Sequence, residues 1–148
     1  MDNPNINSNL EVVAAVISSP LGFFACRRSP HKAAGGKWEF PGGKVDAGES
    51  HSQALAREIW EELNVRVEVG ALILRQSTQV GSQRIDLSCY EVFVVSEFPT
   101  SSTDHDAMNW IGKGELREYD WAAPDLPVVE LLLRQATPPT SRSPRQGR

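Results

Sequence analysis

Three glutamates, Glu58, Glu61 and Glu62, follow one another at intervals that match the turn of a helix. On a helix, this spacing places the three side chains on one face. The carboxylates then repel one another, and a single arginine, Arg57, can pair with Glu61 but cannot neutralise all three. A hard divalent cation can do so, because Mg²⁺ and Mn²⁺ prefer oxygen ligands. Taken alone, the spacing is equally consistent with a metal site and with an acidic, solvated helix face.

Two features that precede this helix favour the metal site. Gly42 and Gly43 lie in a Phe-Pro-Gly-Gly turn, where the absence of side chains exposes the backbone to a ligand. Glu49 precedes Arg57 by eight positions, which is about two turns of a helix. We therefore predict a glycine turn that leads into a helix with an acidic, metal-binding face.

This pattern resembles the signature of the Nudix hydrolases. The signature is Gly, five residues, Glu, seven residues, Arg-Glu, apolar, any, Glu-Glu, any, Gly, apolar. The matching residues are Gly43, Glu49, Arg57, Glu58, Ile59, Glu61, Glu62 and Val65. Asn64 stands where the signature has its second Gly, and this departure is mild because Asn also adopts the left-handed backbone conformation.

The resemblance covers most of residues 10–135. Residues 37–45 (KWEFPGGKV) look like the MutT-type nucleoside triphosphate pyrophosphohydrolases. Residues 104–110 and 123–127 are similar to the bacterial CTP pyrophosphohydrolase branch of that group. The resemblance implies a Mg²⁺-dependent (or Mn²⁺-dependent) enzyme that converts NTP or dNTP to NMP or dNMP plus pyrophosphate. It also implies that water attacks a phosphorus of the triphosphate, usually the β-phosphorus in this branch.

The resemblance also implies roles for individual residues. The cation would be held by the carboxylates of Glu58, Glu61 and Glu62 and by the main-chain carbonyl of Gly42. Glu58 is our first choice as proton acceptor, and Glu61 is the alternative. Arg57 would orient the carboxylates. Gly43 and Glu49 are expected to support the turn and the ligands.

Five further residues are candidates for binding the nucleotide, and each has a structural alternative. Arg27 and Lys44 could neutralise phosphate or be plain surface charges. Phe40 could touch the substrate or pack under the glycine turn. His105 could contact the nucleotide or be solvated. Asp125 could contact the base, cap the last helix, or do both.

The preferred base depends on Asp125, because mutator enzymes that prefer 8-oxo-dGTP commonly have Asn at the matching position. An ionised carboxylate can accept from the amino group of cytosine but faces acceptor atoms on guanine. We therefore favour cytidine-type or modified pyrimidine nucleotides. An 8-oxo-dGTP diphosphatase is the alternative. A Nudix domain that only binds nucleotides is less favoured, because such domains usually lose members of the acidic set, which is complete here.

Composition limits the partners of the chain. It has 148 residues and a formal net charge of -4, so it lacks the broad basic surface that a long nucleic acid requires. Five of the 19 acidic residues lie between Asp46 and Glu62.

Two distant cysteines argue against a disulfide scaffold or a structural zinc site. Without a signal peptide or membrane-length apolar run, we expect a cytoplasmic protein. Whether it is a monomer or a homodimer stays open.

The hydrophobic pattern predicts the elements that carry this site. Strands are expected at residues 10–18, 21–27, 38–40, 65–78, 83–95 and 107–111, and helices at 50–63 and 126–135. Glu49 or Ser50 would cap the first helix. The expected fold is α+β: the Nudix fold, a mixed, mostly antiparallel sheet sandwiched between helices. Residues 1–9 would form a flexible lead-in, 10–136 the domain, and 137–148 a disordered basic tail.

Overall fold

The computed structural model describes residues 8–32, 35–99 and 105–135. The predicted lead-in (except for its last two residues), the basic tail and His105's side chain lie outside the described part of the chain. The elements, in chain order, are β1 (Ser8–Ser19), β2 (Gly22–Arg28), β3 (Trp38–Glu39), β4 (Gly42–Lys44), α1 (His51–Leu63), β5 (Val67–Val80), β6 (Gln83–Val94), β7 (His105–Ile111), two short 3-10 helices, η1 (Lys113–Glu118) and η2 (Ala123–Asp125), and α2 (Leu126–Arg134).

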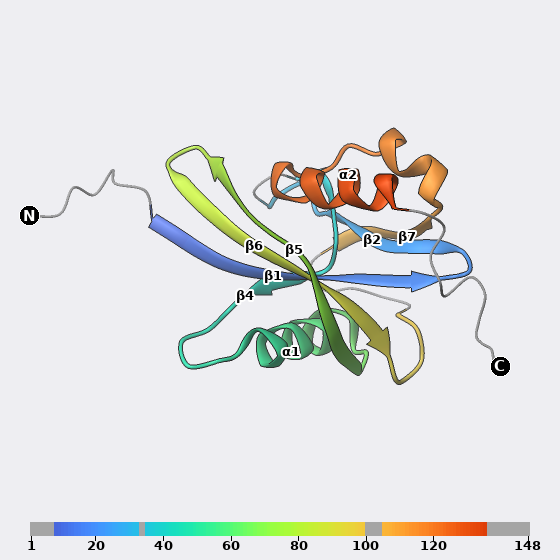
Figure 1. The fold of residues 1–148 in the computed structure, drawn as a ribbon, viewed down its shortest axis with the longest axis horizontal. Coiled ribbons are helices and arrows are strands. Elements are labelled where there is room, and N and C mark those ends of the chain that lie inside the picture. The colour runs from blue at the N-terminus through green and yellow to red at the C-terminus, as the bar shows by residue number, and fades with distance from the viewer. Residues whose placement is uncertain (1–7, 33–34, 100–104, 136–148) are drawn as a thin grey trace, which may run out of the picture.

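The sheet is mixed, with β1 at its centre. Its strands follow the order β3-β2-β1-β6-β5, while β4 pairs with β1 and β7 pairs with β2. The pairing of β1 with β6 is parallel, and the other pairings are antiparallel. Figure 1 shows α1 on one face of this sheet and α2 on the other. The predicted α+β architecture, a mixed sheet between helices, is confirmed.

The apolar run of β1 is explained by burial on both faces of the sheet. Val13 and Ile17 belong to the core under α1, which also contains Leu55 and Ile59 of that helix. Ala14 and Val16 alternate with them and belong to the core under α2. Successive side chains of a strand point to opposite faces, so one strand supplies both cores. Both helices are therefore fixed relative to the same central strand.

Helix α1 begins and ends where its sequence predicts. Ser50 is the N-cap: its hydroxyl accepts from the backbone N–H of Gln53, and the Gln53 side chain accepts from the backbone N–H of Ser50. This reciprocal pair satisfies two of the N–H groups that a helix start leaves open. Asn64 ends the helix in the left-handed conformation, with φ 58° and ψ 39°, as predicted for the substituted signature position.

One strand was not predicted. Residues Gly42–Lys44 form β4 against Val12, Val13 and Ala14 of β1, in the segment that the sequence marks as a turn. A side chain at Gly42 would overlap the carbonyl oxygen of Val13, so only glycine permits this close pairing. The pairing ties the glycine turn to the centre of the sheet.

Among the residues that the structure describes, neither α1 nor any other helix has the length and apolar character of a membrane span.

Candidate active site

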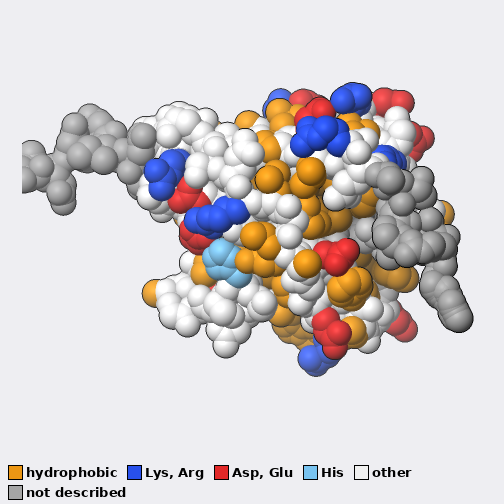
Figure 2. Space-filling model, viewed as in Figure 1, with side chains coloured by type: hydrophobic (Ala, Val, Ile, Leu, Met, Phe, Trp, Pro, Cys, Tyr) orange, Lys and Arg blue, Asp and Glu red, His pale blue; other side chains and the backbone are white. Residues whose placement is uncertain are grey.

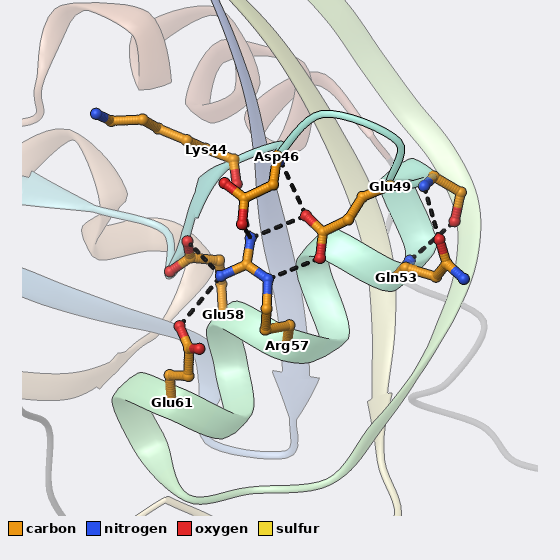
Figure 3. Close-up of polar contacts among 8 residues, drawn as sticks. Lys44, Asp46, Glu49, Gln53, Arg57, Glu58 and Glu61 are labelled. Atoms are coloured by element: carbon orange, nitrogen blue, oxygen red, sulfur yellow. Dashed lines mark hydrogen bonds and ion pairs between the residues drawn. The ribbon is translucent and has the colours of Figure 1, made fainter.

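Arg57 is the centre of a network of carboxylates on α1 and the preceding loop (Figure 3). Its Nε donates to Glu49 Oε2 at 2.7 Å and its Nη2 donates to Glu49 Oε1 at 3.0 Å. Its Nη1 donates to Glu58 Oε2 at 3.2 Å and to Glu61 Oε1 at 3.1 Å. Nη2 also lies 3.5 Å from Asp46 Oδ2. One guanidinium therefore orients four carboxylates, which its planar set of donors makes possible.

The loop between β4 and α1 presents Glu49 to the arginine in a fixed geometry. The backbone N–H of Asp46 donates to Glu49 Oε1 at 2.9 Å, and the backbone N–H of Glu49 donates to the Asp46 carbonyl at 3.0 Å. Arg57 Nη2 also donates to the Lys44 carbonyl at 3.1 Å. The hydrogen bond from Arg57 holds the pKa of Glu49 below its ordinary value, so this carboxyl stays ionised at neutral pH.

The glutamates of α1 differ in their surroundings. Glu62 is buried, with 9% exposure, whereas the side chain of Glu61 is 56% exposed. Glu58 lies against the glycine turn, where a Cβ at Gly43 would clash with its carboxyl group. Burial raises the pKa of Glu58 above its ordinary value, and hydrogen bonds to Arg57 and Glu62 oppose this shift only in part.

The arrangement of these side chains differs from a closed metal cage. Among the described residues, no group of three or more His, Cys, Asp or Glu side chains is arranged to hold a metal ion. The physical reason is that Glu58 and Glu61 both direct an oxygen toward Nη1 of Arg57. The donor set nevertheless fits a hard divalent cation, because every candidate ligand is an oxygen and the missing side chain of Gly43 lets the Glu58 carboxyl lie against the glycine turn.

Asp125 contacts the segment that leads into the glycine turn and is almost fully buried, with 6% exposure. Its Oδ2 accepts from the backbone N–H of Phe40 at 2.9 Å. It occupies the N-cap position of α2, as one of the expected alternatives has it, but its side chain makes no capping hydrogen bond to the helix. The reason is that its carboxyl turns toward Phe40. Burial raises its pKa to about 8; the Phe40 hydrogen bond opposes the shift, and the charge of Glu39 adds to it.

Phe40, whose backbone N–H donates to this carboxyl, belongs to an aromatic cluster. The ring of Phe40 is buried and stacks on Trp121, with centroids 4.9 Å apart. The rings of Tyr119 and Trp38 are almost perpendicular, with centroids 5.0 Å apart. The guanidinium of Arg27 lies 6.0 Å from the Trp38 ring centroid. We refer to Trp38, Phe40, Tyr119 and Trp121 as the aromatic wall. Of the candidates for nucleotide binding, Phe40 belongs to this wall, and Arg27 and Asp125 contact it.

The other two nucleotide candidates are placed differently. Lys44 ends β4, one residue after Gly43, and Figure 3 shows its side chain pointing away from Arg57. The backbone of His105 begins β7, opposite Arg28 of β2. Its side chain is outside the part of the molecule that the structure describes.

Comparison with known proteins identifies the family. The sequence model of the NUDIX domain matches residues 9–142. The chain belongs to the Nudix family. It is 34% identical over 133 residues to the CTP pyrophosphohydrolase of Escherichia coli K12, covering 87% of this chain and 96% of that protein. It is 33% identical over 96 residues to the 8-oxo-dGTP diphosphatase of Proteus vulgaris, covering 64% and 83% of the two chains.

A solved structure gives the same result for the fold. The solution structure of the E. coli ORF135 protein superposes with a TM-score of 0.71 at 30% identity, and it covers 90% of this chain and 94% of that one. The Nudix signature of this chain therefore occupies the glycine turn and α1 in a fold that a solved protein shares. The resemblance inferred from Gly43 to Val65 is confirmed.

Sequence reasoning did not select two parts of this Nudix site. Asp46 contacts Arg57, and its position three residues before Glu49 is the signal that could have indicated a shared turn. The carbonyl of Lys44 also binds Arg57, and no sequence signal marks a backbone acceptor.

Trp121 is buried and its Nε1 donates to the Leu116 carbonyl at 2.7 Å, so its side chain belongs to the core under α2.

Proposed function

We propose that this Nudix hydrolase cleaves nucleoside triphosphates, NTP or dNTP, to NMP or dNMP plus pyrophosphate with Mg²⁺ or Mn²⁺. The observation that carries the proposal is the Arg57 network, which gathers the carboxylates of Glu49, Glu58 and Glu61 next to the glycine turn. The names of the two relatives support this substrate class. The proposed site of action is the cytoplasm, and the proposed substrate is a single nucleotide and not a long nucleic acid.

Each residue of the network has a proposed role. Glu58, Glu61, Glu62 and the Gly42 carbonyl would hold the cation. When bound, the cation neutralises phosphate charge and lowers the pKa of the attacking water. Glu58 would take the proton, because a carboxylate beside the cation can accept it from the attacking water, and Glu61 is the alternative.

The remaining residues position these groups and the nucleotide. Arg57 orients Glu58 and Glu61. Glu49 fixes Arg57, and Gly43 leaves room for the Glu58 carboxyl. These positioning residues act through the ligands and not on the substrate itself.

The nucleotide is proposed to bind at the aromatic wall. Arg27 and Lys44 would neutralise the phosphates, and His105 would contact the nucleotide. Asp125 would read the base edge next to Phe40. An ionised Asp125 accepts from the amino group of cytosine or a modified pyrimidine. The preferred substrate on this reasoning is a cytidine-type nucleotide.

A second candidate, 8-oxo-dGTP, is favoured by one specific observation. The pKa of Asp125 is raised to about 8, so much of this carboxyl is protonated at pH 7. Its Oδ2 accepts from Phe40, and a proton on the other oxygen would make that oxygen a donor. A donor can meet the acceptor atoms of a purine such as 8-oxo-guanine, which removes the main objection to that base.

One assay tests the activity and the base preference together. Pyrophosphate release is measured with dCTP, 5-methyl-dCTP and 8-oxo-dGTP in the presence of Mg²⁺. The cytidine-type proposal requires the highest kcat/KM for one of the first two, and a clear preference for 8-oxo-dGTP would select the second candidate. No turnover of any triphosphate by folded protein would refute both. Tight nucleotide binding in calorimetry without hydrolysis would instead indicate a binding domain.

A further inference from the structure

The loop that presents Asp46 and Glu49 to Arg57 is attached to the sheet at both ends through one residue, Glu11 of β1. At the start of the loop, the backbone N–H of Val45 donates to the Glu11 carbonyl at 3.0 Å. At its end, Nε2 of His51, the first residue of α1, lies 3.0 Å from Glu11 Oε2. The main chain and the side chain of Glu11 therefore hold opposite ends of the same loop.

His51 has a second partner on the sheet. Its Nδ1 lies 2.8 Å from the hydroxyl of Tyr90 on β6. Because an ionised carboxylate only accepts, Nε2 carries the proton toward Glu11, and in the neutral ring Nδ1 accepts from the Tyr90 hydroxyl. Both ring nitrogens are thus used, and they fix the first turn of α1 to two adjacent strands, β1 and β6.

Arg75 of β5 holds Glu11 in place. Its Nη1 lies 2.6 Å from Glu11 Oε2 and 2.7 Å from the Ser88 hydroxyl, and its Nη2 donates to Glu11 Oε1 at 3.2 Å. The hydrogen bond from Arg75 holds the pKa of Glu11 below its ordinary value, so this carboxyl is ionised at neutral pH. Figure 2 shows acidic, basic and histidine side chains gathered on this face over β1, β5 and β6.

We propose that His51 and Glu11 are positioning residues for the carboxylate network, acting through the loop that carries Asp46 and Glu49. We refer to His51, Glu11, Tyr90 and Arg75 as the His51 cluster. None of them belongs to the Nudix signature, and none contacts Arg57, Glu58 or Glu61 in the interactions described above. The cluster fixes where the loop ends; the loop fixes Glu49, and Glu49 fixes Arg57.

This inference rests on the proposed role of the carboxylates, and its first test does not need that role. Hydrogen–deuterium exchange is measured on the full chain without metal. In Glu11→Ala and His51→Ala, the amides of Asp46, Glu49 and Gln53 are expected to exchange about ten-fold faster, the cost of one charged hydrogen bond. Glu130→Ala removes an exposed ion pair with Arg117 and is the matched control, with no change in this loop.

The second test is kinetic. Both alanine variants are expected to lower kcat and raise the Mg²⁺ concentration for half-maximal rate by about ten-fold, as outer partners of metal ligands commonly do. The nucleotide KM should change less than two-fold, since the aromatic wall is not in the cluster. Glu11→Gln keeps an oxygen acceptor for His51 and should restore most of the rate.

Several results would overturn the proposal. These are unchanged exchange in the loop, a rise in KM with an unaltered kcat, or an equal loss of rate in Glu130→Ala at matched thermal stability. If the wild-type protein hydrolyses no triphosphate, the proposed function fails, and the exchange experiment still decides whether the cluster orders the loop.

Discussion

Replacing Asp125 by Asn should change how the stability of the fold depends on pH. Burial raises the pKa of this carboxyl from 3.8 to about 8 in the folded protein. The folded state therefore binds the proton more tightly than the unfolded state does. The contribution of Asp125 to stability is complete below pH 3.8, falls as the pH rises, and is lost above about pH 8.

The size of the effect follows from linkage. Within this window, the free energy of unfolding falls by about 1.4 kcal/mol per pH unit on account of this one group. Between pH 5 and pH 7, the wild-type protein should lose about 2.7 kcal/mol relative to Asp125→Asn. The amide cannot ionise, and its oxygen can still accept from the Phe40 N–H, so the packing is retained.

The assay is urea unfolding in the presence of a chelator at pH 5, 6, 7 and 8. Asp120→Asn is the matched control, because Asp120 has the same chemistry in the same segment but its side chain is 71% exposed. That control should run parallel to the wild type at every pH. If the difference between the wild type and Asp125→Asn does not grow with pH, the burial argument for Asp125 is refuted.

Three further predictions concern the glycine turn and α1. Arg57→Lys should lower kcat by about 10-fold to 100-fold, because an ammonium cannot bridge Glu49 and Glu58 with paired donors. Steady-state kinetics would measure this, with circular dichroism to show that the fold is unchanged, and a wild-type rate would contradict it. Gly43→Ala should lower kcat with little change in the melting temperature, because the new Cβ displaces only the flexible end of the Glu58 side chain; a variant with the wild-type kcat would show that this contact does not matter. Ser50→Ala should cost about 1 kcal/mol of unfolding free energy, since it removes the capping bond to Gln53; denaturant titration measures this, and no loss would exclude the cap.

The chemistry-bearing helix was predictable because its signals are local. The spacing of its apolar residues, the Ser50 cap and the left-handed Asn64 all lie within one segment, and the structure agrees with each of them. The turn between β5 and β6 was predictable for the same reason, with Gly81 at φ 62°. The sequence therefore indicates most of the geometry that places Arg57 and its glutamates on one helix.

Features that depend on distant contacts were not predictable. Val65 was assigned to a strand because it is apolar, yet β5 begins at Val67 and Val65 is buried in the core under α1. The sequence left open whether Asp125 contacts the base, caps α2 or does both, and it does not indicate that the carboxyl accepts from the backbone N–H of Phe40, far away in the sequence. The choice between such partners is made by tertiary packing, which periodicity does not encode.

The parallel pairing of β1 with β6 affects the order in which the chain folds during translation. Residue Ser8 pairs with Gln83 and Ile17 with Val92, so the two central strands are separated by the whole of α1 and β5 along the chain. During translation, the helix with the carboxylates emerges well before β6, which completes the face on which it packs. Contacts of such long range slow folding, so the packing that fixes the active-site helix is completed late, after β6 has joined β1.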